Sequence, residues 1–316
     1  MAFFNRFQKN TLALSVLGAT LLLTGCGGGG SDGGSNTSTP STQKVSIEFA
    51  ALAGTLPIKC GEKITNIGST SATVELQDLR FYVSDVHLMN AADQEIPVTL
   101  DRNEWQAEGV ALVDLEDGAG ACAENTLNDA SGKPLPNTIR AVVTGTVPVG
   151  QYTGVGYTVG VPHTINHSDY NRAPFDIQSM GWGWQAGRRF LKLEIKPDDK
   201  VTLLNGSTSN AWMVHLGAGD CKGDPRKGEI TACTYPNRMA FHAHSFDANT
   251  QKIAVDLQSF FATSDVTKDA GNAVGCMANP SDPECTTIFA KLKIDLATGL
   301  PTDGGHGQGL FKVVSK

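Results

Sequence analysis

The chain has 316 residues, of which 35 are glycine and only 18% are charged. This length allows one large domain or two smaller ones, with enough apolar residues for a core. The formal net charge of -7 argues against a nucleic-acid partner, because proteins that bind nucleic acids present basic surfaces. Short alternating runs outnumber helical ones, so we expect an all-β fold, an antiparallel β-sandwich with long disulfide-stapled loops.

Residues 1–25 predict the signal peptide of a bacterial lipoprotein. Arg6 and Lys9 supply positive charge, residues 12–23 form an apolar stretch too short to span a membrane, and a lipobox ends at Cys26. An ordinary signal peptide or a membrane anchor is the alternative. We expect cleavage before Cys26 and lipidation of its sulfur, which would anchor the protein on the periplasmic face of a bacterial membrane, preferably the outer membrane.

The composition changes after the lipobox. Residues 26–43 are rich in glycine, serine and threonine, which predicts a disordered tether. Residues 44–316 carry the alternating apolar patterns, and we expect them to form a single β domain.

Six cysteines remain once Cys26 is set aside. An even number of cysteines in an oxidising compartment predicts three disulfides, although the sequence alone leaves the pairing undecided. A thiolate metal site is the alternative, but the chain has no Cys-x-x-Cys spacing to support it. Pairing of nearest neighbours suggests Cys60 with Cys122, Cys221 with Cys233, and Cys276 with Cys285.

Alternating patterns predict about a dozen short strands. The clearest cover residues 44–53, 72–89, 95–100, 139–148, 151–161, 190–195, 201–204, 211–216, 239–246 and 253–257.

Several local features refine this pattern. Residues 72–89 form one strand or two, with a break near Gln77-Asp78, and residues 148–150 predict the turn of a hairpin between 139–148 and 151–161. A second hairpin is expected to join 239–246 to 253–257. Residues 258–264 are expected to form the only short helical turn, and residues 286–295 a strand or a short helix.

Two tryptophans two residues apart stand out in the middle of the chain. Trp182 and Trp184 each follow a glycine, just before a run that alternates apolar and charged residues. In an extended segment both indoles point to the same face. This face is a candidate for binding or chemistry.

The seven histidines of the chain are the main candidate metal ligands. His215 lies inside an apolar strand, where a buried imidazole needs a hydrogen-bonding acid or a metal, and His167 lies in a polar loop of the kind that often carries sites. His242 and His244 share one strand face and could chelate an ion, but solvent exposure explains them equally well. We interpret His87 and His306 as structural or solvated.

Common enzyme motifs are absent from the sequence. It contains no nucleophile elbow, phosphate-binding loop, zinc-protease helix, haem-attachment motif or EF-hand loop. Asp114, Glu116 and Asp117 form an acidic cluster that we interpret as a solvated loop rather than an acid and base pair. A hydrolase is therefore unsupported, and we expect a protein that is not an enzyme.

A set of short motifs occurs in a characteristic order along the chain. The motifs are residues 79–86 (LRFYVSDV), Asn137-Thr138, 145–152 (GTVPVGQY), 159–162 (VGVP), Asn166-His167, 180–184 (MGWGW), 215–217 (HLG), and Cys233 with 236–238 (PNR). In this order they resemble the MbnP-like copper-binding protein family, the four-Cys member of the metallo-mystery pair. The resemblance runs from about residue 44 to the end of the chain.

The resemblance implies a specific function. Members are exported β-proteins whose partner is a MauG-like di-haem protein of the cytochrome c peroxidase type, and this partner oxidises the first tryptophan of the Trp-x-Trp motif to kynurenine. Kynurenine and two histidines then hold one Cu(I). By motif, Trp182 would be modified, Trp184 would support it, and His167 and His215 would be the histidine ligands.

Copper homeostasis is thus the expected role, with two other functions left open. A surface adhesion or carbohydrate-binding module would use Trp182 and Trp184 as an aromatic platform. A secreted hydrolase would need a site that the sequence does not contain. One departure from the family is Arg188-Arg189-Phe190, where relatives commonly carry an aromatic residue and a lysine, and we expect it to affect a docking surface more than the copper site.

Overall fold

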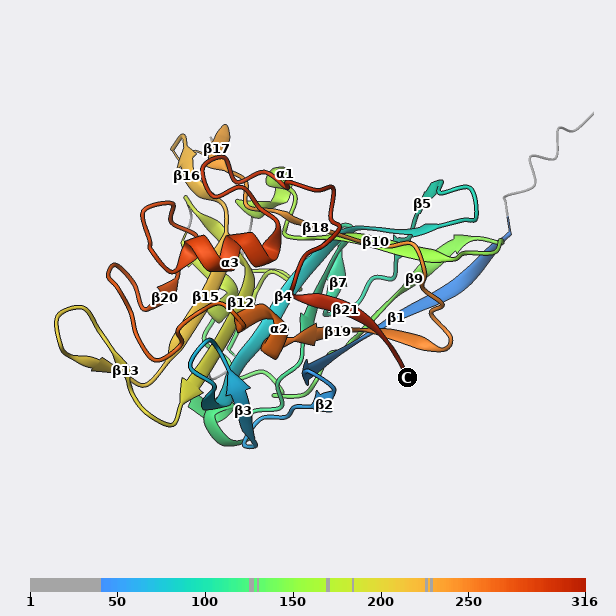
Figure 1. The fold of residues 1–316 in the computed structure, drawn as a ribbon. Coiled ribbons are helices and arrows are strands. Elements are labelled where there is room, and N and C mark those ends of the chain that lie inside the picture. Colours follow the sequence, from blue (N-terminus) through green and yellow to red (C-terminus); the bar gives the residue numbers. More distant parts are fainter. Residues whose placement is uncertain are drawn as a thin grey trace, which may run out of the picture. The chain divides into compact units, whose positions relative to one another are not determined.

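Two β-sheets make up most of the protein in the computed structural model (Figure 1). The structure describes residues 41–124, 128–129, 131–168, 171–183, 185–224, 227 and 230–316. The predicted signal peptide, Cys26, most of the predicted tether and Trp184 lie outside these residues. The first strand begins at Thr42, two residues before the expected start of the domain.

The smaller sheet has six strands and contains both the first and the last strand of the chain. β1 and β19 pair in parallel, whereas the other pairs are antiparallel. The order is β21 (Phe311–Ser315), β19 (Gln251–Asp256), β1 (Thr42–Ala53), β9 (Val142–Pro148) and β6 (Thr99–Leu100), with β2 (Leu56–Pro57) beside β1.

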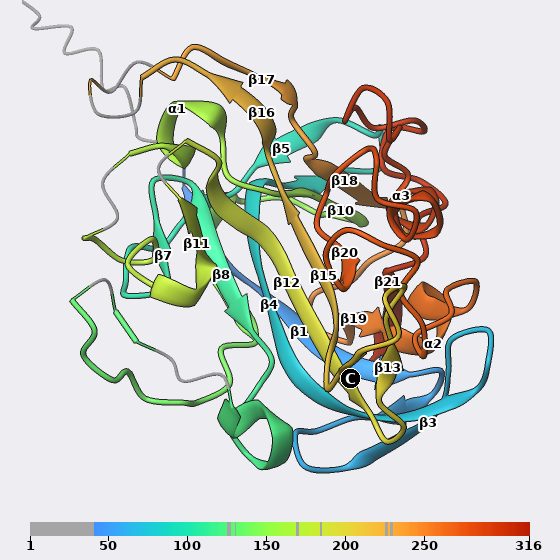
Figure 2. The ribbon, with the colours of Figure 1, turned by 90° about the vertical axis from the view of Figure 1, so that its left-hand side faces the viewer.

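The larger sheet has eleven strands and is built around one long strand, β4, which runs beside β12 and β8 (Figure 2). Its main order is β18 (Met239–Ala243), β10 (Gly154–Val159), β4 (Ala72–Met89), β12 (Gly187–Pro197), β15 (Trp212–Gly217) and β20 (Gly275–Cys276). The strands off this path are β3 (Lys63–Ile67), β5 (Glu95–Pro97), β7 (Gln106–Ala107), β8 (Val110–Asp114) and β11 (Gly181–Gly183).

Short strand pairs and helices complete the described part of the chain. The pairs are β13 (Val201–Thr202) with β14 (Thr208–Ser209), and β16 (Gly219–Lys222) with β17 (Ala232–Tyr235). The helices are η1 (Gly120–Glu124), α1 (His163–Asn166), η2 (Gln178–Met180), α2 (Leu257–Phe261) and α3 (Cys285–Leu292). No helix among the described residues has the length and apolar character needed to cross a membrane.

Aromatic side chains join the inner faces of the two sheets. Phe81 of β4 contacts Phe49 of β1 and Phe311 of β21, with ring centroids 5.5 and 5.3 Å apart. Phe311 also contacts Tyr157 of β10 at 5.6 Å. All four rings are nearly inaccessible to solvent, so they form the middle of an apolar core. The predicted all-β sandwich is confirmed.

Both predicted hairpins are wrong. β9 lies in the smaller sheet while β10 lies in the larger one, and β18 and β19 are divided in the same way. The segment that connects β9 to β10, residues 149–153, therefore carries the chain from one sheet to the other. Five of the six residues of β10 are buried, as expected for a strand with neighbours on both edges and packing on both faces. Two runs of alternating apolar and polar residues joined by a short turn are compatible either with a hairpin or with strands in two different sheets. The sequence pattern therefore could not distinguish these arrangements.

Other local predictions also need correction. β4 runs unbroken past the expected interruption, because Gln77 is accommodated as a bulge: Glu194 pairs with Asp78, and the next residue of β12 pairs with Leu76. α1 lies where a loop was expected, whereas the short helix that was one of two alternatives for residues 286–295 is confirmed as α3. The expected helical turn near 258–264 is confirmed as α2, but it is not the only one.

The three predicted disulfides are confirmed. Cys60 bonds Cys122, Cys221 bonds Cys233, and Cys276 bonds Cys285. The first joins the loop after β2 to η1, and the other two close short loops. Pairing of nearest neighbours along the chain is therefore confirmed for all three bonds, although only the second and third close short loops.

Charged side chains are buried on the other face of the larger sheet. The strand registers place Asp114, Arg80, Lys192 and His215 side by side on β8, β4, β12 and β15. None of them is more than 5% exposed. The expectation that the acidic cluster is a solvated loop is therefore wrong for Asp114 and Glu116, which are completely buried.

Burial controls the protonation of these two acids. It raises the pKa of Asp114 to about 8 and that of Glu116 to about 7. Arg80 lies 4.0 Å from the Asp114 carboxylate and 3.1 Å from the Glu116 carboxylate, and its charge lowers both pKa values. The loss of hydration outweighs this attraction, so Asp114 is mainly protonated at neutral pH.

Removal of the disulfides should destabilise the protein according to loop length. Replacing Cys60 and Cys122 by serine should lower the free energy of unfolding by about 4 kcal/mol, because the bond joins residues 62 positions apart. The Cys276–Cys285 bond joins residues 9 positions apart, and its loss should cost about 3 kcal/mol. Urea unfolding of the two double variants tests this, and an equal or larger loss for the shorter loop would contradict it.

The free energy of unfolding should fall as the pH rises from about 5 to about 9. Up to about pH 8 the folded chain retains the proton of Asp114, whose ordinary pKa is about 4, while the unfolded chain has released it. The stabilisation is complete below pH 4 and is lost as the pH passes 8. Asp114→Asn should flatten this dependence, whereas Asp117→Asn, at an exposed neighbouring position, should not. Urea unfolding at pH 5, 7 and 9 measures the difference, and equal slopes in both variants would refute the assignment.

Candidate metal centre

Trp182 lies in β11, which forms a short hairpin with the start of β12. Its half-buried indole rests against Gly217 of β15, where an added Cβ would lie 2.7 Å from the ring. A glycine at this position therefore lets the indole approach the strand. The edge of the indole also meets His215, with ring centroids 6.4 Å apart and ring planes at 89°. Two of the predicted ligands thus lie against each other.

His215 is held on both sides by charged groups. Its Nδ1 accepts a hydrogen bond from Arg189 Nε at 3.3 Å, so the proton must lie on Nε2, which donates to Glu194 Oε1 at 2.7 Å. The Arg189 guanidinium also lies 5.8 Å from the centre of the Trp182 ring. The Nδ1 lone pair is the donor available to a metal.

The surroundings keep His215 neutral. Burial lowers the pKa of this imidazole, against the hydrogen bond to Glu194, which raises it. Burial also lowers the pKa of the Arg189 guanidinium. A neutral imidazole is the form that binds metal ions.

The hairpin that carries Trp182 is tied to helix α1. Asn166 Oδ1 accepts from the backbone N–H of Arg188 at 3.0 Å, and the Arg188 side chain donates to the carbonyl oxygens of Ile165 and Asn166. At the tip of the hairpin, Gln185 Nε2 donates to the carbonyl oxygen of Cys221 at 2.9 Å. These bonds fix the positions of Trp182, α1 and the Cys221–Cys233 disulfide relative to one another.

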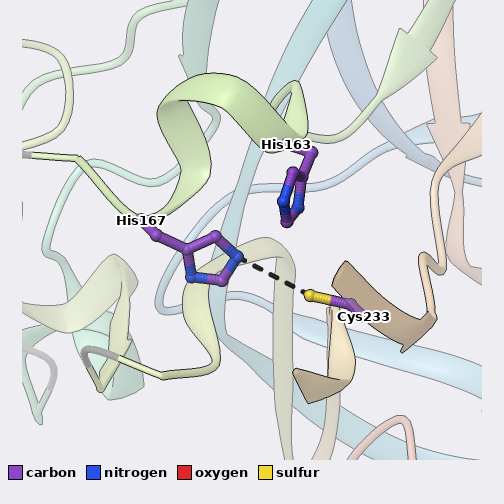
Figure 3. A group of neighbouring side chains, drawn as sticks. All are labelled: His163, His167 and Cys233. Carbon is purple, nitrogen blue, oxygen red and sulfur yellow. Dashed lines mark hydrogen bonds between the residues drawn. The ribbon is translucent and has the colours of Figure 1, made fainter. Parts of the chain in front are cut away.

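His167 follows α1 and lies at this disulfide rather than against His215. Figure 3 shows His163 and His167 side by side, with the His167 Nε2 facing the Cys233 sulfur at 3.6 Å. The two imidazoles are 5.2 Å apart between ring centroids. Because Cys233 is bonded to Cys221, its sulfur is not a thiolate ligand. The structure therefore places Trp182 against His215, whereas His167 lies against the neighbouring strand pair, β16 and β17.

A cavity of about 500 Å³ opens beside Trp182. Gln185, Cys221 and Tyr235 line it, together with Met277, whose thioether is a soft donor. The cavity gives a small reactant or ion a route to the indole. Trp184, predicted to support Trp182, lies outside the described residues.

Three residues at this site were not predicted from the sequence. Glu194 and Arg189 hold the imidazole of His215, and His163 stands beside His167. The spacing of four residues between His163 and His167 is a signal that could have been used, because it places both side chains on one face of a helical turn. Glu194 gave no such signal, because its alternation with apolar residues is typical of a solvent-facing side chain.

Comparisons with known proteins agree with this arrangement. The MbnP family model matches residues 42–278, which include His167, Trp182 and His215. Among solved structures, MbnP from Methylosinus trichosporium is 34% identical, with a TM-score of 0.76, and the match covers 87% of this chain and 99% of that chain. No curated protein sequence matches the chain. The chain therefore belongs to the MbnP family, and this membership links it to copper binding.

Proposed function

We propose that the protein binds one Cu(I) through His215, His167 and a kynurenine formed from Trp182. The observation that carries this proposal is the contact of Trp182 with the neutral imidazole of His215, whose Nε2 is hydrogen-bonded to Glu194. Metal-binding histidines commonly donate their second ring N–H to a carboxylate, which fixes the tautomer and orients the ring. His215 has this partner, so the residues present fit a copper ion.

Conversion of Trp182 would supply the third ligand. Cleavage of the indole C2–C3 bond with insertion of two oxygen atoms gives N-formylkynurenine, a four-electron oxidation that two molecules of hydrogen peroxide can drive with release of two waters. Hydrolysis then removes the formyl group as formate and leaves an aryl amine beside a ketone. The amine nitrogen and two imidazoles form a donor set of low coordination number, which suits Cu(I). The cavity beside Trp182 offers access for the oxidant.

Arg189 makes this site different from the pattern expected for relatives. Its Nε–H donates to the same Nδ1 that copper would use. Copper and Arg189 therefore compete for one lone pair, and Arg189 must release it before copper binds. The guanidinium also donates to the carbonyl oxygens of Ser179 and Gly181, so it can stay anchored there. This departure from the family pattern at Arg189 therefore acts on the proposed ligand His215 itself and not only on a docking surface.

The second histidine would come from the segment after α1. Asn166 ties this segment to the Trp182 hairpin, and the Asn166 Nδ2 lies 3.3 Å from His167 Nε2. To bind the copper, His167 would have to leave its contact with the Cys233 sulfur.

The cellular setting belongs to the same proposal. Lipidation of Cys26 would anchor the protein on the periplasmic face of a bacterial membrane, and three disulfides suit an oxidising compartment. The partner would be a MauG-like di-haem protein of the cytochrome c peroxidase type that oxidises Trp182. The protein would serve copper homeostasis by binding the ion and would not turn over a substrate.

Co-expression with the di-haem partner should convert Trp182 to kynurenine and create the copper site. Intact-mass and peptide mass measurements should locate the change at Trp182, and the modified protein should bind one Cu(I) in competition with a chromophoric chelator. Trp182→Phe should lose this binding. Trp105→Phe is a matched control, because Trp105 is also half-buried with an arginine 4.6 Å from its ring. Equal copper binding by both variants would disprove the role of kynurenine.

Glu194→Gln should weaken Cu(I) binding by about 10 to 100 fold, because the carboxylate orients His215. Glu75→Gln on β4 is the control, since this carboxylate pairs with Lys63 at 2.8 Å and has no contact with His215. The same chelator competition measures both variants of the modified protein. An affinity of the Glu194→Gln variant within a factor of two of the unsubstituted protein would argue against His215 as a ligand.

A further inference from the structure

A second group of histidines lies on the larger sheet, away from Trp182. β18, β10 and β4 are neighbours in that order, and Gly156 of β10 pairs with His242 on one side and with His87 on the other. The backbones that carry the two histidines are separated by two strand spacings, about 10 Å. Their imidazoles nevertheless come to 5.1 Å between ring centroids. The two side chains therefore lean toward each other across the middle strand.

Gly156 makes this approach possible. A Cβ at this position would lie 2.2 Å from His87 Nε2 and 2.4 Å from His242 Cδ2. Such distances are far inside van der Waals contact, so any other residue would push the rings apart. The glycine leaves the space between two imidazoles open.

Both imidazoles are held in the tautomer that a metal needs. His87 Nδ1 lies 2.8 Å from the carbonyl oxygen of Asp85, and His242 Nδ1 lies 2.5 Å from the carbonyl oxygen of Gly304. A carbonyl oxygen only accepts hydrogen bonds, so each Nδ1 must carry the proton. Each Nε2 consequently keeps its lone pair when the ring is neutral.

A carboxylate stands opposite both lone pairs. Glu95 Oε1, from β5, lies 3.6 Å from each Nε2. The three atoms lie within 4.8 Å of one another, and His87 Nε2 is buried without a hydrogen-bond partner among the residues that the structure describes. A tetrahedral ion with bonds of about 2.0 to 2.1 Å separates its ligands by about 3.4 Å, close to the 3.6 Å between Glu95 Oε1 and each Nε2. The Glu95 side chain is 60% exposed, which leaves one side open to solvent.

We propose that His87, His242 and Glu95 form a second metal site that binds a divalent ion of the Zn²⁺ or Cu²⁺ type, with water in the remaining position. Two neutral imidazoles and one carboxylate are preferred ligands for such borderline ions, whereas Cu(I) favours softer sets. The site shares no residue with the Trp182 centre, so it stands or falls independently of the copper(I) proposal. His306, whose ring lies 5.6 Å from that of His242, is a neighbour outside this ligand set.

Metal titration of the Trp182→Phe protein tests the site, because this background removes the first centre. Competition with a chromophoric chelator should give one bound Zn²⁺, and Cu²⁺ in its place should show hyperfine coupling to two nitrogens by electron paramagnetic resonance. His87→Phe and His242→Phe should each abolish tight binding, and Glu95→Gln should weaken it by at least about tenfold, or 1.4 kcal/mol. His244→Phe is the matched control, since this exposed histidine stacks on His306 at 5.2 Å and should leave binding unchanged.

Gly156→Ala guards against an effect of misfolding, because it keeps all three ligands and only fills the space between the rings. Circular dichroism and thermal unfolding in a chelator identify the variants that remain folded. Loss of binding in a folded Gly156→Ala protein supports the site. Unchanged binding in folded His87→Phe and His242→Phe proteins overturns it, and so does an equal loss in His244→Phe, which would assign the ion to the exposed histidines.

Discussion

The candidate copper centre depends on a chain of charges buried under the Trp182 hairpin. Arg80 holds Asp78 at 2.6 Å, Lys192 joins Asp78 to Glu194, and Glu194 holds His215 at 2.7 Å. All of these side chains are at most 8% exposed. Removing one member of such a chain leaves its partners unpaired and typically costs about 3 to 5 kcal/mol. Each charged side chain therefore depends on its neighbours for a partner. The chain of charges ends at His215, whose imidazole lies next to Trp182.

This arrangement explains how a β-sheet can present a precise donor. The apolar face of the larger sheet packs on the smaller sheet through Phe81, whereas the charged face is covered by the segment around Ser179, whose hydroxyl accepts from Arg80 at 2.7 Å. Both faces are thus inside the protein. A ligand that is rigid in the absence of the ion loses little conformational entropy on binding, which favours affinity.

The sequence predicts the class of fold, many of the strands and the disulfides. It does not predict which distant strands pair or which side chains they bring together. Alternation identified every described strand of six or more residues but missed shorter ones such as β3, β8 and β21. The even number of cysteines indicated three disulfides, and nearest-neighbour pairing gave their partners. Alternation could not show that Lys192 and Glu194 face a buried surface, because a covered polar face and a solvated one have the same pattern. It also could not bring His87 and His242 together, since they are 155 positions apart and meet only because Gly156 lies between them.

The parallel pairing of β1 with β19 has a consequence for how the chain acquires its structure. Phe49 pairs with Ile253, so one edge of β1 has no partner until four fifths of the chain has been synthesised. Contacts between such distant segments carry a large loop-closure cost and slow folding. Until then the open edge of β1 is a template for pairing with another chain. A chaperone that covers extended apolar segments would protect the protein during this interval.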